Sequence, residues 1–498
     1  MENQNKYLIA GMGNEGKALG AIATTARDIL GNPVEVRGWS RSASRTEPMI
    51  VAAQTYSERN PSFDYRDQMG LCIMEFDLKS RQRIFRPERY QNGLEDELQN
   101  TIYEHGDKVR IRNFLDLVTS DFELAMKGSS ETSALPNYVI VCTTANAHSK
   151  IAERLANFIY NNQDLLYNHR GGLNLVFSPE RFLGAWEAMV RFYAQLHVQS
   201  ERDNLPEQEL ANLVECCNDK IIFAAAATSP VASRIDPEVK SLVHILGSKD
   251  WAGVAAIPES YTTLLARELR NVFPAYKAIE REPKGLESDN SEKDRDVRFT
   301  TAASTIAVML HVAMTTWGFP LFPIPKMKYY VDLPKNPVIR EAIQRIDDER
   351  VAALNAVFGI DAWCGRTLMS RLYENTNHNS FIEAIQENPA YAEIGCPELI
   401  DRNGKLTRYI LEEVPFTAQP LAELQPDLMP FTLDSIQNAN NIAFLLTGRR
   451  LDDLSAGRTP ESLGLEGKSS SEIAHMLKNG FVSDELLAYH IDNIRKAH

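Results

Sequence analysis

The residues near the start of the chain that could do chemistry are three glycines, Gly11, Gly13 and Gly16, in the pattern Gly-x-Gly-x-x-Gly. An apolar run, residues 7–10, precedes them, and a helical pattern follows through residue 29. In such a motif the first glycine permits a tight turn, the second lets the backbone approach a pyrophosphate, and the third lets the helix pack close to the strand. The N–H groups that open the helix, beginning at Asn14, would hold the pyrophosphate. The pattern predicts a dinucleotide site, although a glycine-rich turn without a ligand fits it too.

The residues after the second strand indicate which dinucleotide is bound. That strand, residues 34–39, is followed by Ser40, Arg41 and Ser42, with no acidic residue before Glu47. An acid here would hold the ribose 2′-hydroxyl of NAD, whereas an arginine with neighbouring hydroxyls can bind the 2′-phosphate of NADP. These residues favour NADP(H) over NAD(H). A solvated loop arginine is the plainer alternative for Arg41.

His311 is the first acid–base candidate. It lies in an apolar helical stretch, residues 307–317. A histidine there can titrate near neutral pH and exchange a proton with a reacting nitrogen or oxygen. Taken alone, a histidine in an apolar helix is more often a hydrogen-bonded core residue.

Two adjacent carboxylates, Glu412 and Glu413, form the second candidate. They follow Arg408 and Tyr409 and stand directly before a Val-Pro pair that ends a helix. A carboxylate at this point could orient an imidazole and favour its charged form. Taken alone, a solvated helix end accounts for the same residues.

The elements that must position these residues change in character along the chain. Strands and helices alternate first, and the continuous apolar run at residues 138–144 is typical of a central parallel strand. Thr143 begins the loop at its carboxyl end, where such a sheet binds its cofactor, so it is a further cofactor-binding candidate. We expect other strands at residues 173–177, 220–225, 242–246 and 251–257, and helices at residues 150–160 and 259–272.

Two segments interrupt or end this alternation. Residues 57–127 exceed what a minimal nucleotide-binding fold needs, and residues 280–298 form a charge-dense linker. Helical periodicity dominates afterwards, with helices expected at residues 336–358, 368–373, 380–387 and 432–446. The prediction is therefore α/β plus all-α: a Rossmann-like domain with a doubly wound parallel sheet, residues 1–290, then a helical domain, residues 295–498.

The composition of the chain argues against several classes of protein. The chain has 498 residues, and a formal net charge of -14 argues against a nucleic-acid partner. Its most apolar region, residues 306–325, is interrupted by His311, glycine and prolines, so we expect buried core and no membrane span. The six cysteines form no Cys-x-x-Cys pair and no signal-peptide pattern precedes them, which predicts free thiols in a cytoplasmic protein. The histidines and cysteines form no metal-binding motif.

Taken together, these features resemble the octopine/nopaline-type opine dehydrogenases. In that family a run like Arg-Tyr-Leu-Thr-Glu-Asp-Val-Pro-Tyr-Gly-Leu-Val-Pro follows a helical-domain histidine, and here residues 408–420 read Arg-Tyr-Ile-Leu-Glu-Glu-Val-Pro-Phe-Thr-Ala-Gln-Pro. Residues 457–465, Gly-Arg-Thr-Pro-Glu-Ser-Leu-Gly-Leu, are similar to a second signature. Further matches are the Asp-x-Glu-Arg helix at residues 346–360, Ser233-Arg234, Ile245-Leu-Gly-Ser-Lys249 and Phe273-Pro274.

The resemblance implies a reaction: an α-keto acid and the amine of an amino acid condense to an imine, which NADPH reduces to a secondary amine dicarboxylate. It assigns the proton transfer to His311, oriented by Glu413, and makes Arg408 and Arg234 candidates for binding carboxylates. Departures from the family motifs, such as Glu413 in place of aspartate and Thr417 in place of glycine, suggest an outlying member with its own substrate pair.

Three alternatives stay open. One is the opine-metallophore branch, which uses a larger aminobutyrate-type amine. Another is a two-domain dehydrogenase acting on a hydroxy acid or polyol, and the third is a non-catalytic protein that senses NADPH. All three have small-molecule partners, and the sequence leaves the oligomeric state, a homodimer included, undecided.

Overall fold

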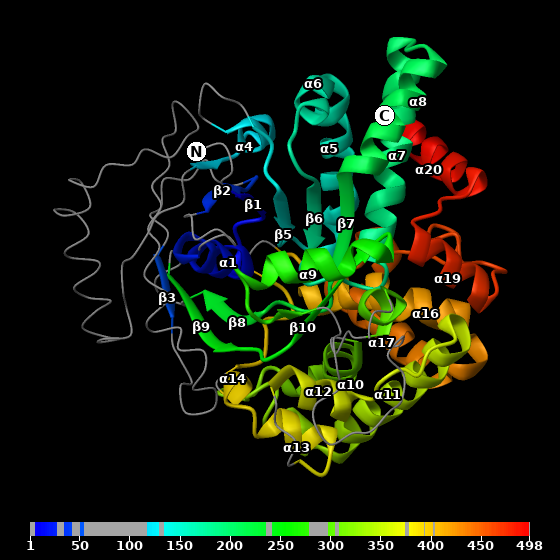
Figure 1. Ribbon diagram of the computed structural model, residues 1–498. Helices are drawn as coiled ribbons and strands as arrows, with labels where there is room; N and C mark the ends of the chain where they lie inside the picture. Colours follow the sequence, from blue (N-terminus) through cyan, green and yellow to red (C-terminus); the bar gives the residue numbers. More distant parts are fainter. Residues whose placement is uncertain are drawn as a thin grey trace.

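The computed structural model describes residues 5–26, 34–41, 50–53, 117–128, 134–235, 242–277, 297–303, 308–373, 378–392, 394–401 and 404–497. Most of the elaboration expected at residues 57–127 and most of the linker expected at residues 280–298 lie outside these ranges, as does Ser42. Figure 1 shows a sheet region built from the first half of the chain beside a helical region built from the second half.

The main sheet confirms the predicted α/β fold. Its strand order is β11-β10-β7-β6-β5-β1-β2-β4, and every described pairing is parallel except that of β7 with β10. The strands are β1 (Lys6–Ala10), β2 (Glu35–Trp39), β4 (Leu117–Thr119), β5 (Tyr138–Val141), β6 (Leu173–Phe177), β7 (Ile221–Ala226), β10 (Ala252–Ile257) and β11 (Tyr276–Lys277). The end of the segment expected as an elaboration therefore contributes β4 to this sheet.

A small second sheet explains why β10 runs antiparallel to β7. It has the order β3-β9-β8, with β3 at Ile50–Ala53, β8 at Val231–Ile235 and β9 at Leu242–Ser248. The chain leaves β7, runs out along β8 and back along β9, and enters β10 without a crossover helix. A parallel neighbour would need such a crossover. The strand predicted at residues 242–246 is thus present but lies outside the main sheet.

Alternate residues of the central strands face two separate apolar cores. Leu8 and Val139 point to one core, which also contains residues of α5 (His148–Asn161) and α7 (Gly184–Asp203). Tyr7 and Ile140 point to the other, which contains residues of α1 (Asn14–Thr25) and α9 (Thr262–Arg270). Both faces of the sheet are covered, which fits the wholly apolar sequence of β5 that predicted a central parallel strand.

Two helices of the second half begin at residues whose side chains cap them. The Asn336 side chain accepts a hydrogen bond from the Val338 N–H at the start of α11 (Pro337–Phe358), and Gly359 ends that helix with φ at +60°. Ser380 caps α13 (Phe381–Gln386) in the same way. Such caps fix the ends of two helices that the sequence analysis expected from helical periodicity. The other long helices are α12 (Gly365–Tyr373), α17 (Pro430–Thr447), α19 (Ser470–Asn479) and α20 (Asp484–Ala497).

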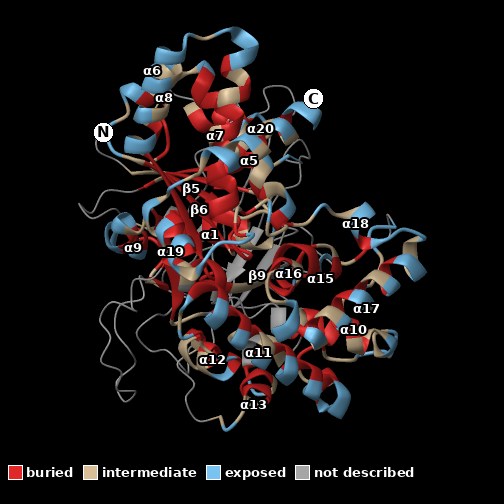
Figure 2. Cartoon of the chain, turned by 90° about the vertical axis from the view of Figure 1, so that its right-hand side faces the viewer, coloured by how far each residue is buried: buried red, intermediate tan, exposed pale blue. Residues whose placement is uncertain are grey.

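The last helix returns to the sheet region. Helix α20 packs against α7, with Ile494 buried among Ala194 and Val198, and Arg495 forms an ion pair with Glu201 (Figure 1). Figure 2 shows buried residues gathered on the central strands and on α7. Within the described residues, no helix combines the length with the apolar composition that a membrane span requires.

Candidate functional site

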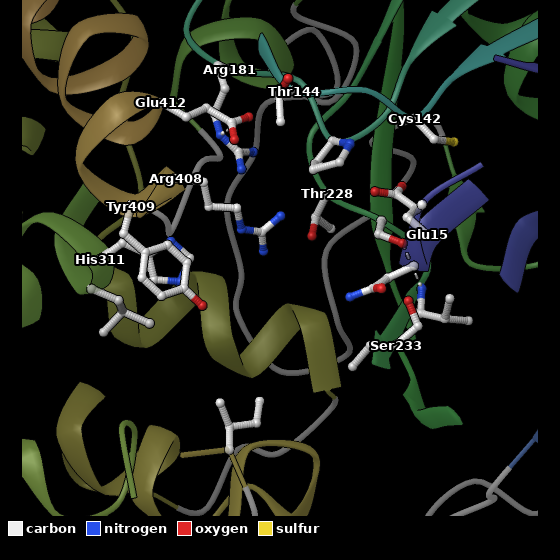
Figure 3. Close-up of a pocket in the computed structure, with 18 of the residues that line it drawn as sticks. Glu15, Cys142, Thr144, Arg181, Thr228, Ser233, His311, Arg408, Tyr409 and Glu412 are labelled. Atoms are coloured by element: carbon white, nitrogen blue, oxygen red, sulfur yellow. Dashed lines mark hydrogen bonds and ion pairs between the residues drawn. The ribbon is translucent and has the colours of Figure 1, made fainter. Parts of the chain in front are cut away.

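A cavity of about 590 Å³ lies where the carboxyl ends of the main-sheet strands meet the helical region (Figure 3). One wall comes from the start of α1 and from the loops that follow β5 and β7. The facing wall comes from the segments around His311 and Arg408. Of the predicted site residues, the cavity brings together Gly13, Asn14, Thr143, His311 and Arg408.

The three motif glycines differ in the space around them. Gly11 has φ at +104°, and its N–H donates to the Trp39 carbonyl at 2.8 Å, which joins the turn to the end of β2. A Cβ on Gly16 would lie 1.8 Å from the Gly11 carbonyl oxygen, so this position admits only glycine. A Cβ on Gly13 would meet no protein atom within 4 Å. The backbone at Gly13 is therefore open to a ligand, while Gly11 and Gly16 close the turn.

Thr143 lies against this turn. Its methyl carbon would be 2.6 Å from a Cβ on Gly11, and its hydroxyl oxygen is buried without a hydrogen-bond partner among the described residues. A buried hydroxyl left unpaired is costly unless a ligand or water completes it. With the open N-terminus of α1, which begins at Asn14 and has no side-chain cap, it forms a polar patch suited to a phosphate-containing cofactor.

Ser40 and Arg41 stand beside the turn, outside the cavity lining. The Ser40 N–H donates to the Thr119 carbonyl at 3.1 Å, one residue beyond the Trp39 carbonyl that accepts from Gly11. Arg41 is exposed, and in the described part of the chain its guanidinium has no ion-pair partner. Its exposed guanidinium is placed to bind an anion at the end of β2.

His311 is held by three side chains. It lies in a π-helical turn (Val308–Val312), its Nδ1 is 3.1 Å from the Oε1 of Glu413, and its Nε2 is 2.7 Å from the hydroxyl of Tyr330. The Tyr409 ring stacks on the imidazole with the ring centroids 4.2 Å apart. Burial lowers the pKa of His311, and the hydrogen bond and charge of Glu413 act in the opposite direction.

Glu413 is 0% exposed, which overturns the alternative of a solvated helix end. Arg181, from the loop between β6 and α7, donates to the same Oε1 atom from its Nη2 at 2.8 Å. Burial raises the pKa of Glu413, but the charge of Arg181 and the hydrogen bond from His311 outweigh it and hold that pKa below its usual range. An ionised carboxylate only accepts hydrogen bonds, so Nδ1 of His311 carries the proton and Nε2 of the neutral ring accepts from Tyr330.

Glu412 has different contacts from those of Glu413. Its Oε1 accepts from the Ala145 N–H at 3.0 Å, in the loop after β5, and lies 3.7 Å from Nε of Arg181. It therefore ties the helical region to the cofactor side of the cavity.

The two predicted carboxylate-binding arginines are placed differently. The guanidinium of Arg408 projects into the cavity (Figure 3), and in the described part of the chain it has no ion-pair partner. Arg234 lies in β8, opposite His244 of β9, and its side chain lies outside the described part of the structure.

Sequence reasoning missed several polar groups that line the same cavity. Arg181 and Tyr330 owe their roles to contacts with residues far away in the chain. Glu15 lies inside the glycine motif, where its Oε1 accepts from the Ser178 hydroxyl at 2.7 Å, and burial raises its pKa to about 7. Lys249, which donates to the Thr228 hydroxyl, ends the Ile-Leu-Gly-Ser-Lys run that carried part of the resemblance.

The sequence of residues 298–426 matches a family described as the alpha-helical domain of NAD/NADP octopine/nopaline dehydrogenases. The chain carries an opine dehydrogenase helical domain. The matched part includes His311 and the run at residues 408–420, so the predicted family resemblance is confirmed there.

Solved opine dehydrogenases have a similar fold. An octopine dehydrogenase structure with NADH and L-arginine superposes with a TM-score of 0.55 at 14% identity, covering 96% of this chain and 99% of that one. Octopine dehydrogenase with NADH and agmatine gives a TM-score of 0.54 at 14% identity, with the same coverage of both chains. Yersinopine dehydrogenase with bound NADP+ gives 0.51 at 12% identity, again covering 96% and 99%. No curated protein sequence matches the chain.

Proposed function

We propose that this chain is an NADPH-dependent opine dehydrogenase, which condenses an α-keto acid with the amine of an amino acid and reduces the resulting imine. One observation carries the proposal: His311, which is hydrogen-bonded to the buried Glu413, lines the same cavity as the open turn at Gly13. A proton-transfer group and a dinucleotide turn in one cavity are the two parts that such a reaction requires.

The cofactor site fits a dinucleotide on its own geometry. Open space beside Gly13, the uncapped start of α1 and the unpaired Thr143 hydroxyl would receive the pyrophosphate. Ser40 and the exposed guanidinium of Arg41 support a 2′-phosphate at the end of β2, hence NADPH over NADH. When bound, the reduced nicotinamide supplies the hydride that reduces the imine carbon.

His311 would move the protons of the condensation. Glu413 fixes the imidazole with Nδ1–H donating, so Nε2 is the atom that exchanges a proton with the substrate. In this structure Nε2 accepts from the Tyr330 hydroxyl, which stands where a substrate oxygen would receive its proton. Loss of water from the condensed intermediate needs a proton on the departing oxygen, and protonated His311 can provide it.

Arg408 would bind the carboxylate of the keto acid. Its guanidinium lines the cavity beside Tyr330 and Tyr409, close to the imidazole that handles the adjacent carbonyl oxygen. A planar guanidinium can hold a carboxylate by two parallel hydrogen bonds, which would fix the orientation of the neighbouring carbonyl.

We further propose a cytoplasmic enzyme, since the five described cysteines are all free thiols.

The test is oxidation of NADPH by the purified chain with pooled α-keto acids, with and without pooled amino acids. Oxidation only when both pools are present supports reductive condensation, and dividing the pools then identifies the substrates. Oxidation with keto acids alone would identify a hydroxy-acid dehydrogenase instead. Binding of NADPH without oxidation, also with aminobutyrate-type amines, would identify a sensor.

A further inference from the structure

The product expected from the proposed function carries two carboxylates, one from each substrate. Among the described residues that line the cavity, three are arginines or lysines: Arg181, Lys249 and Arg408. Arg181 is already neutralised by Glu413 at 2.8 Å and Glu412 at 3.7 Å. Two cations therefore remain for two carboxylates.

Lys249 is held in a fixed place on the sheet side of the cavity. It directly follows β9, and its backbone N–H donates to the Pro230 carbonyl at 2.9 Å. Its ammonium donates to the Thr228 hydroxyl, and Thr228 follows β7, so two loops of the sheet region fix the position of the charge. An ammonium has three N–H donors, and Thr228 takes one of them.

No carboxylate among the described residues lies within ion-pair distance of Lys249. Glu15 is the acid whose charge it feels most, but the Glu15 carboxylate is turned to the Ser178 hydroxyl at 2.7 Å. Burial accordingly lowers the pKa of Lys249 to about 8, and the charge of Glu15 offsets this only in part. An anion bound beside the ammonium would stabilise its charged form and raise the pKa again.

Lys249 and Arg408 belong to facing walls. Figure 3 shows Arg408 entering the cavity from the helical side, with Thr228 and Ser233 across from it. Arg408 shares its wall with His311, the group assigned to the carbonyl oxygen, so the keto acid belongs there. The other wall is left for the second substrate, and the hydroxyls of Thr228 and Ser229 line it.

We propose that Lys249, together with the Thr228 hydroxyl, binds the α-carboxylate of the amino-acid substrate. This assignment rests on the proposed function, and it makes the cavity a clamp for a dicarboxylate whose two ends are held by different domains. It also requires the second substrate to be an α-amino acid, because a simple amine would leave Lys249 unpaired.

The test uses iminodiacetate, a secondary amine with two carboxylates, and N-methylglycine, which lacks one of them. Their dissociation constants are measured by titration calorimetry on the enzyme with NADP+ bound, so catalytic turnover is not needed. We expect iminodiacetate to bind the native chain more tightly than N-methylglycine. Lys249→Met should weaken iminodiacetate about ten- to a hundredfold and so remove most of that preference, the loss expected for one hydrogen bond to a charged group.

Matched variants separate a binding role from a structural one. Lys249→Arg keeps the charge and should retain most of the preference, whereas Thr228→Val should reduce it and Thr228→Ser should not. Lys150→Met removes an exposed lysine of α5 and should change nothing. The melting temperature of each variant verifies that it is folded.

Three results would overturn the proposal. Equal binding of both probes to the native chain would show that the cavity holds one carboxylate only. An unchanged preference in folded Lys249→Met would remove Lys249 from the site. Weaker NADP+ binding in that variant, with the preference kept, would assign Lys249 to a cofactor phosphate. None of these results depends on amine-dependent NADPH oxidation, so they are distinct from a failure of the proposed reaction.

Discussion

Nη2 of Arg181 lies 2.8 Å from Oε1 of Glu413, and the two residues come from different regions of the fold. Arg181 precedes α7 in the sheet region, whereas Glu413 belongs to the helical region, and the oxygen they share also faces His311 at 3.1 Å. The charge on the acid–base pair is therefore set by a residue of the cofactor side. Sheet and helical regions must be in contact for His311 to have its described environment.

Replacing His311 by glutamine should abolish most of the turnover. Glutamine keeps hydrogen-bonding capacity but cannot exchange a proton near neutral pH, so kcat should fall about two orders of magnitude or more while NADPH still binds. Steady-state kinetics and a fluorescence titration of NADPH measure the two quantities. His475→Gln, on the exposed face of α19, is the control. Unchanged turnover in His311→Gln would remove His311 from the mechanism.

Replacing Glu413 by glutamine should move the pH dependence of the reductive reaction to lower pH. If protonated His311 is the proton donor, kcat/KM for the keto acid falls as pH rises through the pKa of His311, which burial holds below the usual value of about 6.5. The charge and hydrogen bond of Glu413 raise that pKa, so their loss should lower it further. The midpoint of the alkaline limb of the profile reports the change.

The neighbouring acid is the control for that experiment. Glu412→Gln alters the contact with the Ala145 N–H and leaves the Glu413–His311 hydrogen bond intact, so its alkaline limb should stay near that of the native enzyme. Equal displacement of the limb in both variants would mean that total charge matters and that the Glu413 contact has no specific role.

Alanine at Gly13 and alanine at Gly16 should differ in their effect on stability. Gly13 has φ at −80° and open space around it, so Gly13→Ala should fold normally and lose affinity for NADPH. At Gly16 the new Cβ would overlap the Gly11 carbonyl, so Gly16→Ala should also lower the free energy of unfolding by about 1–3 kcal/mol or more. Denaturant unfolding and NADPH titration separate the two effects. Full NADPH affinity in Gly13→Ala would argue against a pyrophosphate at the turn.

Replacing Arg41 by alanine should weaken NADPH about ten- to a hundredfold and leave NADH nearly unchanged, because only NADPH carries the 2′-phosphate. Arg202→Ala removes an exposed arginine at the end of α7 and serves as the control. The ratio of the two dissociation constants is the measurement. Equal weakening of both cofactors would mean that Arg41 does not read the phosphate.

The parts of the fold that were predicted are those with local signals. The turn between β1 and α1 is encoded by its glycines, and α11 by its asparagine and glycine caps. By contrast, β8 was missed because Ser233 and Arg234 interrupt its apolar run. The predicted helix after the glycine turn is too long, since α1 ends at Thr25 and Ala26 is already extended. The helical pattern continues through residue 29, so it gave no sign that the backbone becomes extended at Ala26.

The residues of the candidate site likewise divide into those that the sequence indicated and those that it did not. His311 and Glu413 were candidates from their own sequence context, and the resemblance gave them roles and added Arg408. The three residues lie close together in the structure. Arg181 could not be predicted, since its partner Glu413 lies more than two hundred positions later in the chain. Lys249 was within a recognised segment, but only the fold turns its ammonium toward a cavity shared with Arg408.

The return of α20 to α7 makes the end of the described chain part of the sheet region. The start of the helical region is bonded there too, because the Val297 N–H donates to Glu259 at 2.8 Å. Between these two points, Arg458 forms an ion pair with Glu187 of α7 at 2.6 Å. The helical region is therefore held to the sheet region at both ends of its sequence, and packed contacts and a buried charge pair fasten together the two regions that supply the facing walls of the cavity.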